Sequence, residues 1–121
     1  MHNQKIGKIG ESIAQDFLRS HNHIVLTKNY YSRSGEIDII SIHNKKLIFT
    51  EVKTRISNRF GTPLESLTYK KRQRMLKTAL HFLNNTTEKL PFSWSFHLVA
   101  IQLNKDHSLK DIQHIKNILN G

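Results

Sequence analysis

The segment 35-GEIDIISIHNKKLIFTEVK-53 decides the fold, because it contains two apolar runs joined by a short polar turn. Both runs are rich in β-branched and aromatic residues, which predicts a β-hairpin. If Asn44 and Lys45 form a two-residue loop, Asp38 on the first strand faces Glu51 on the second. Asn-Lys is a weaker turn signal than Asn-Gly, and a slip of one residue would put the two acids on opposite faces.

In this register three acids and a lysine project from one face of the hairpin, near its open end: Glu36, Asp38, Glu51 and Lys53. Directly opposed residues have Cβ atoms about 4.5–5.5 Å apart, which lets two carboxylates hold one cation. Charged groups among apolar strand residues are costly to bury for structural reasons alone. The cluster is therefore the main functional signal in the chain.

Carboxylate oxygens are the preferred protein ligands of Mg²⁺ and Mn²⁺. We expect Asp38 and Glu51 to bind such an ion, with the backbone carbonyl of Val52 as a third ligand. Lys53 would contact a scissile phosphate or orient the attacking water, whose pKa the metal lowers. Two further acids are candidates for supporting the ligands or binding a second metal: Glu36, and Glu11 on the first expected helix.

Each of these residues also has a plain structural interpretation. Glu51 and Lys53 could form an ordinary ion pair on an edge strand, which adds little stability. Glu36 could be a solvated acid at a strand end, and Glu11 an acid favoured by the helix dipole. The apolar setting of Asp38 and Glu51 favours the functional interpretation for the hairpin.

Composition limits the classes of protein to consider. The chain has 121 residues, a formal net charge of +10 and no cysteine. We expect a single domain over residues 1–121 that folds without disulfides or cysteine-bound zinc. The start of the chain does not have the pattern of a signal peptide, and no apolar run is long enough for a membrane span. These features predict a cytoplasmic protein whose first candidate partner is a polyanion.

Hydrophobic spacing predicts the other elements of the chain. We expect a helix over about 4–21, a strand over 23–30, a helix from about residue 63, a strand within 92–103, and a closing helix from about Ser108. The predicted order is αβββαβα, a mixed α/β sheet covered by helices. The second helix should bury the stripe Met75, Leu76, Ala79, Leu80 and Leu83, and the closing helix Ile112, Ile115 and Leu119.

Basic residues follow the hairpin and recur on the second helix: Arg55, Arg59, Lys70, Lys71, Arg74 and Lys77. Contacts from these side chains to phosphates would position a nucleic acid without reading its sequence. The alternative for each residue is a solvated position opposite the core stripe. The eight histidines form no metal-binding motif, and we expect most of them at the surface.

The order of these motifs resembles a known family. Asp38 followed by Glu51-Val52-Lys53 is similar to the PD-(D/E)XK nuclease signature, and the whole chain resembles the YraN-like family of small bacterial proteins. The further matching motifs are Gly10-Glu11-x-x-Ala14, Asn29-Tyr30, Gly35-Glu36-Ile37-Asp38, and Gly61-Thr62-Pro63-Leu64-Glu65. Family members often carry an arginine and an aspartate around the phenylalanine of the late strand, where this chain has Ser95-Phe96-His97.

The resemblance implies a restriction-endonuclease-like core similar to that of Holliday junction resolvases. It implies that Asp38, Glu51 and Lys53 form the catalytic set and that Glu11 lies near the metal. Our first hypothesis is a Mg²⁺- or Mn²⁺-dependent endonuclease acting on DNA, branched or structured, in repair or recombination. The alternative is a nucleic-acid-binding module with a nuclease fold that docks on DNA or a repair partner without cutting it. RNA would use the same site, and resolving a junction would require a homodimer.

Overall fold

The computed structural model describes residues 2–56, 62–87, 89–91 and 93–120. Its elements are α1 (His2–Ser20), β1 (Ile24–Ser32), β2 (Gly35–His43), β3 (Lys46–Arg55), a 3₁₀ turn (Pro63–Ser66), α2 (Tyr69–Asn85), β4 (Trp94–Leu103) and β5 (Leu109–Asn120). The strands form one sheet in the order β1-β2-β3-β4-β5. Only β3 and β4 are parallel, because α2 lies in the connection between them. The predicted mixed α/β sheet with flanking helices is confirmed.

The central hairpin has the predicted register. Ile42 pairs with Leu47 and His43 with Lys46, so the loop is the two-residue turn at Asn44 and Lys45. Their φ angles of 49° and 60° are the left-handed values that a type I′ turn requires. A turn of this kind fixes the register, and the register in turn fixes which side chains share a face.

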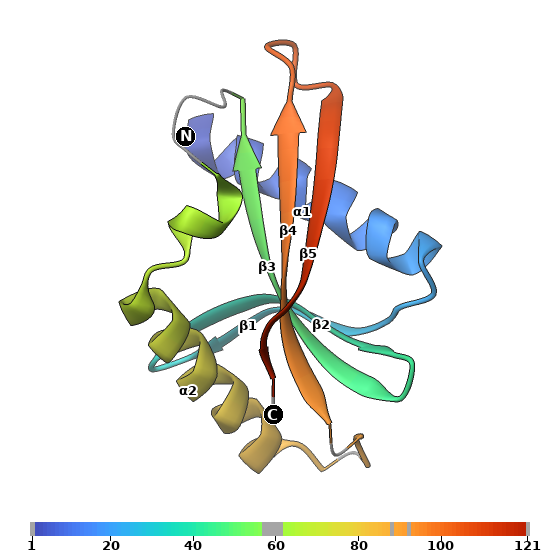
Figure 1. Ribbon diagram of the computed structural model, residues 1–121, viewed down its shortest axis with the longest axis vertical. Coiled ribbons are helices and arrows are strands. Elements are labelled where there is room, and N and C mark those ends of the chain that lie inside the picture. Colours follow the sequence, from blue (N-terminus) through green and yellow to red (C-terminus); the bar gives the residue numbers. More distant parts are fainter. Residues whose placement is uncertain (1, 57–61, 88, 92, 121) are drawn as a thin grey trace.

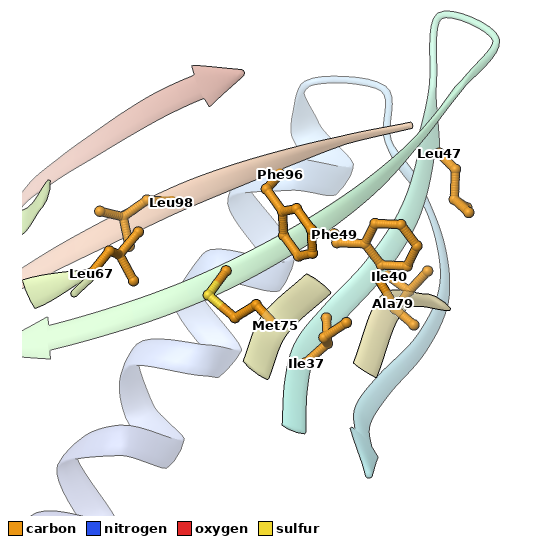
Figure 2. Packing of buried hydrophobic residues seen from close by; sticks show 9 residues of the cluster. All are labelled: Ile37, Ile40, Leu47, Phe49, Leu67, Met75, Ala79, Phe96 and Leu98. Carbon is orange, nitrogen blue, oxygen red and sulfur yellow. The ribbon is translucent and has the colours of Figure 1, made fainter. Parts of the chain in front are cut away.

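The two helices pack on opposite faces of the sheet and bury two separate apolar clusters (Figure 1). Ala14 and Leu18 of α1 pack with Ile39, Val99 and other residues on one face. The cluster on the other face includes Met75 and Ala79 of α2 (Figure 2). Its buried residues are Ile37, Ile40, Leu47, Phe49, Leu67, Met75, Ala79, Phe96 and Leu98. The sheet is thus covered on both sides, and β4, apolar on both faces as predicted, is central.

The prediction that Leu80 belongs to the buried stripe of α2 is wrong. Leu80 is 44% exposed, whereas Thr78 is fully buried. Thr78 Oγ1 lies 3.5 Å from the position that a Cβ on Gly35 would occupy, and it accepts a weak hydrogen bond from Ser32 Oγ at 3.4 Å. The start of β2 therefore packs against Thr78 of α2, and Leu80 lies on the exposed side of the helix.

The predicted closing helix is also wrong, because residues 109–120 form the edge strand β5. Ile112 packs on the α1 side of the sheet, whereas Ile115 and Leu119 pack on the α2 side. Between these last two positions β5 uses four residues while its partner β4 uses two, and Asn117 in this bulge has a φ of 56°. A strand with apolar residues on both faces and a bulge imitates helical spacing.

The sheet divides at the open end of the hairpin. The pairing of β2 with β3 ends at Ile39 and Thr50, but β1 stays paired with β2 as far as Gly35, and β3 stays paired with β4 as far as Arg55. The two halves of the sheet separate there, and Figure 1 shows β1 and β2 turning away from β3, β4 and β5. We call the space between the diverging ends of β2 and β3 the fork.

Neither helix in the described part of the chain combines the length and the apolar composition that crossing a membrane requires.

Candidate metal centre

Three acids from two elements meet in the fork. Carboxylate oxygens of Glu11 on α1 and of Glu36 and Asp38 on β2 all lie within 4.8 Å of one another. Glu51 on β3 is close enough for its charge to raise the pKa of both Glu11 and Asp38. The structure thus brings together three of the four acids that the sequence predicted for the site and places the charge of the fourth, Glu51, beside them.

Asp38 is anchored across the fork. Its Oδ2 accepts a hydrogen bond of 2.7 Å from the backbone amide of Val52, so the side chain bridges β2 and β3 where their own pairing has ended. Asp38 is only 8% exposed. Burial, and after it the charge of Glu51, raises the pKa of Asp38 from 3.8 to about 9, although the Val52 amide favours the ionised form. A buried carboxyl in this state holds a proton unless another cation replaces it.

The approach of α1 to β3 places Glu11 in the cluster. A Cβ atom on Gly10 would lie 1.8 Å from Thr54 Oγ1, so only a glycine allows this close contact. The next residue is Glu11, whose pKa is raised by burial and by the charges of Glu36 and Glu51. The Gly-Glu pair thus has a physical reason: the glycine permits the contact that brings the acid to the fork.

Asn29 is a site residue that sequence reasoning missed as a functional group. Its side-chain amide lies between two acids, and with its nitrogen turned toward them it donates to Glu11 Oε1 at 3.1 Å and to Glu36 Oε1 at 3.3 Å. Its φ of 51° is unusual for a strand residue. The Asn29-Tyr30 motif was the available signal, because asparagine tolerates this backbone conformation better than most residues.

The two lysines of interest have unexpected positions. Lys71 of α2 forms an ion pair of 2.5 Å with Glu51 Oε2. Lys53 instead lines a separate hollow of about 220 Å³ beside Arg55, Gln102 and other residues. Among the described residues, no hydrogen bond or ion pair joins Lys53 to an acid of the fork. The cation that touches the cluster therefore comes from α2, not from β3.

The other predicted basic residues lie on α2, at the end of β3 and outside the described part of the chain. Lys70, Arg74 and Lys77 are exposed on α2, and Arg74 lines a hollow of about 270 Å³ with Glu36, Lys71 and others. Arg55 Nη2 donates to the carbonyl of Thr62 at 3.3 Å. Arg59 lies outside the described residues. The hollow thus brings one acid of the fork, Glu36, next to the basic residues Lys71 and Arg74 of α2.

The donor set fits a hard divalent cation. Its donor atoms are carboxylate oxygens, which suit Mg²⁺ and Mn²⁺ and which lie close enough together to share one ion. The Val52 amide holds Asp38 in place, as a supporting hydrogen bond does for a metal ligand. Asp38 shares this group with Glu11 and Glu36, whereas Glu51, predicted as the second main ligand, is not a member of it. Glu51 and the Val52 carbonyl stay predicted ligands.

Comparison with known proteins identifies the family. The model of the uncharacterised protein family UPF0102 matches residues 10–101. The chain is 43% identical over 115 residues to a UPF0102 protein of Clostridium novyi, with 95% of each chain covered. It is 36% identical over 117 residues to one of Caldicellulosiruptor bescii, covering 97% of this chain and 98% of the relative. The chain belongs to UPF0102, the YraN-like family. Every acid of the fork lies within the matched residues, and so do Asn29 and Lys71.

This UPF0102 chain also has a histidine cluster, two of whose rings are buried, that sequence reasoning did not identify. His23 and His97 are 5% and 4% exposed. His23 stacks on His43 with ring centroids 4.2 Å apart and bonds Ser41 Oγ through Nδ1 at 2.8 Å. His97 Nδ1 lies 2.9 Å from His114 Nε2. Sequence reasoning missed the cluster because three of these rings come from strand residues whose partners are distant in the sequence.

Burial is the main cause that keeps three of these rings, His23, His97 and His114, neutral. Burial, and after it the charges of neighbouring groups, lowers the pKa of His23 and His114 from 6.5 to about 4 and that of His97 to about 3. Within the described residues, only the acids of the fork bring three metal-binding side chains within reach of one ion. The histidine cluster is therefore part of the core that packs on the end of α1, with Phe17 edge-on to His114.

Proposed function

We propose that this UPF0102 protein is a Mg²⁺- or Mn²⁺-dependent phosphodiesterase that cuts DNA, with branched or structured DNA as the favoured substrate. The observation that carries the proposal is the convergence of Glu11, Glu36 and Asp38 with Glu51 in the fork. Four acids with one contacting lysine cost stability. A site that binds a divalent cation gives this arrangement a purpose.

The residues of the chain would divide the work of the reaction. Asp38 and Glu51, with the Val52 carbonyl, would hold the ion, and Asn29 would keep Glu11 and Glu36 turned toward it. When bound, the ion neutralises phosphate charge and lowers the pKa of a bound water. Lys53, on the same strand as Glu51, would approach the phosphate from the neighbouring hollow.

The basic surface would hold the substrate. Lys70, Arg74 and Lys77 are exposed on α2, Arg74 also lines the hollow shared with Glu36, and the whole chain has a net charge of +10. Contacts of this kind go to phosphates and carry no base preference. We therefore expect selection by the shape of the nucleic acid, in the cytoplasm, with a homodimer where two cuts are made.

Cleavage assays test the proposal. Labelled linear, flapped and four-way DNA and a matched RNA are incubated with Mg²⁺, with Mn²⁺ or with EDTA, using wild type, Asp38→Asn and Asp16→Asn. Asp16 is an exposed acid on α1, so its replacement makes the same chemical change, from carboxyl to amide, away from the fork. We expect metal-dependent cutting by wild type and Asp16→Asn, and a loss of at least about 100-fold in Asp38→Asn.

The position of Lys53 gives a reason to keep a second candidate. Since no hydrogen bond or ion pair joins Lys53 to the acids in the described structure, the second candidate is a nuclease-fold module that binds DNA without cutting it. DNA binding that is weakened by salt, unaffected by Asp38→Asn and independent of metal would favour this module. Cutting that requires both Asp38 and Lys53 would favour the enzyme.

A further inference from the structure

The ion pair between Lys71 of α2 and Glu51 of the fork is not accounted for by the proposed metal site. Lys71 Nζ lies 2.5 Å from Glu51 Oε2, and the Glu51 side chain is only 10% exposed. Among the described residues, Lys71 is the one cation within 4.0 Å of an acid of the fork. Its ammonium group therefore neutralises a predicted metal ligand, which is what a bound metal ion would also do.

The backbone of Lys71 is fixed, whereas its side chain is free to move. Its backbone amide donates to Thr68 Oγ1 at 3.2 Å, which caps the start of α2 and fixes the main chain. Its side chain is 40% exposed and lines the hollow shared with Glu36 and Arg74. A lysine stem has four rotatable bonds, so the ammonium can leave Glu51 without moving the helix.

The hollow offers Lys71 a second partner. It is lined by Glu36 and by the exposed Arg74, and its volume of about 270 Å³ is large enough for a phosphate group. A lysine ammonium binds phosphate as a compact point charge. After release from Glu51, the side chain would therefore face the backbone of a nucleic acid held on α2.

We propose that Lys71 is an exchangeable counter-ion of the metal site. It pairs with Glu51 while no metal is bound, gives up Glu51 when a divalent cation enters, and then contacts substrate phosphate in the hollow. Metal loading thereby increases the affinity of the hollow for nucleic acid. This inference rests on the proposed metal-dependent function and adds to it the residue that couples metal to substrate.

Metal titration tests the first half. Mn²⁺ binding is measured by calorimetry at pH 8 with wild type, Lys71→Gln and Lys70→Gln, and circular dichroism verifies the fold of each. Lys70 is the adjacent exposed lysine, so Lys70→Gln makes the same change in net charge. Because Lys71 competes with the ion for Glu51, we expect Lys71→Gln to bind Mn²⁺ about fivefold or more tightly than wild type, and Lys70→Gln to stay within about twofold.

The outcomes separate the two proposals. If wild type binds Mn²⁺ at Asp38 but Lys71→Gln binds it no more tightly than Lys70→Gln does, the counter-ion role is wrong and the metal site stands. If wild type does not bind Mn²⁺, both the metal site and the counter-ion role are wrong.

DNA binding tests the second half. Fluorescence anisotropy with labelled DNA is measured in Ca²⁺, chosen as a hard cation for the same donors, and in EDTA. We expect Lys71→Gln to weaken DNA binding several-fold in Ca²⁺ and by less than about twofold in EDTA, because only the released ammonium reaches phosphate. An equal loss under both conditions would overturn the coupling.

Discussion

Asn29 shows how one side chain can organise a site made from distant parts of the chain. Its amide lies between Glu11 of α1 and Glu36 of β2, two acids that would otherwise repel each other. Asn29 has a φ of 51°, a left-handed value that asparagine tolerates better than most residues. Supporting hydrogen bonds of this kind orient ligands, and their loss weakens metal binding.

Replacing this residue tests its role. Asn29→Gly keeps the left-handed backbone and removes the amide, so Glu11 and Glu36 lose their common donor. We expect the dissociation constant for Mn²⁺, measured by calorimetry, to rise about tenfold.

Asn22→Gly is the matched control, because Asn22 has a φ of 70° and lies outside the fork, after the end of α1. An equal change in both variants, or no change in Asn29→Gly, would contradict the role of Asn29.

At the scale of elements, the contact between α1 and β3 carries Glu11 to the site. Gly10 faces Thr54 of β3 with no space for a side chain, whereas Gly7 has no atom within 4 Å of the position of its missing Cβ. Two glycines of one helix therefore have opposite sensitivities. The first serves packing, and the second only lowers helix propensity.

Alanine substitutions distinguish them. Gly10→Ala forces α1 away from β3, and we expect it to lower the free energy of unfolding by about 1–3 kcal/mol and to weaken Mn²⁺ binding by displacing Glu11. Gly7→Ala should raise the free energy of unfolding by about 0.5–1 kcal/mol and leave metal binding unchanged. Urea unfolding with calorimetry measures both. Equal stability of the two variants would show that the close contact is absent.

The elements also show what sequence reasoning could and could not predict. The hairpin was predictable to the residue, because alternation and a two-residue loop leave one register that buries the apolar side chains. β5 was not, because Ile112 and Ile115 lie on opposite faces and a bulge precedes Leu119. Spacing alone cannot distinguish such a strand from a helix.

The sequence predicted which acids form the site but not which lysine contacts them. Asp38 and Glu51 follow from the hairpin register, and Glu11 from the family resemblance. The separation of Lys53 from the acids and the arrival of Lys71 depend on where the sheet divides and on how α2 docks. Both are tertiary features with no local pattern in the sequence.

At the scale of the whole molecule, the fork and the histidine cluster respond to pH in opposite directions. Asp38 keeps a proton in the folded state that the unfolded chain releases, so folding loses stability from this group as pH rises between about 4 and 9. His23 and His97 stay neutral in the folded state. Since the unfolded chain takes up their protons below about pH 6.5, folding loses stability from these groups as pH falls.

The histidine contribution can be measured separately. His97→Asn removes a group that titrates only on unfolding, so the loss of stability between pH 7 and pH 5 should be smaller than in wild type by about 1–2 kcal/mol. Urea unfolding at the two pH values gives this difference. His107→Asn is the control, since His107 lies in the β4–β5 turn with a φ of 70° that asparagine tolerates. A pH dependence of His97→Asn identical to that of wild type would contradict the account.

The central claim is that the fork is a metal site, and titration of Mn²⁺ tests it most directly. Calorimetry at pH 8 is run on wild type, on Asp38→Asn and on Asp16→Asn, the variant of the exposed α1 acid. Asp38→Asn replaces a carboxyl that can ionise on metal binding by an amide that cannot. We therefore expect Mn²⁺ binding by wild type and Asp16→Asn and a loss of at least about tenfold in Asp38→Asn. Equal and weak binding by all three proteins would show that the four acids do not form a metal site.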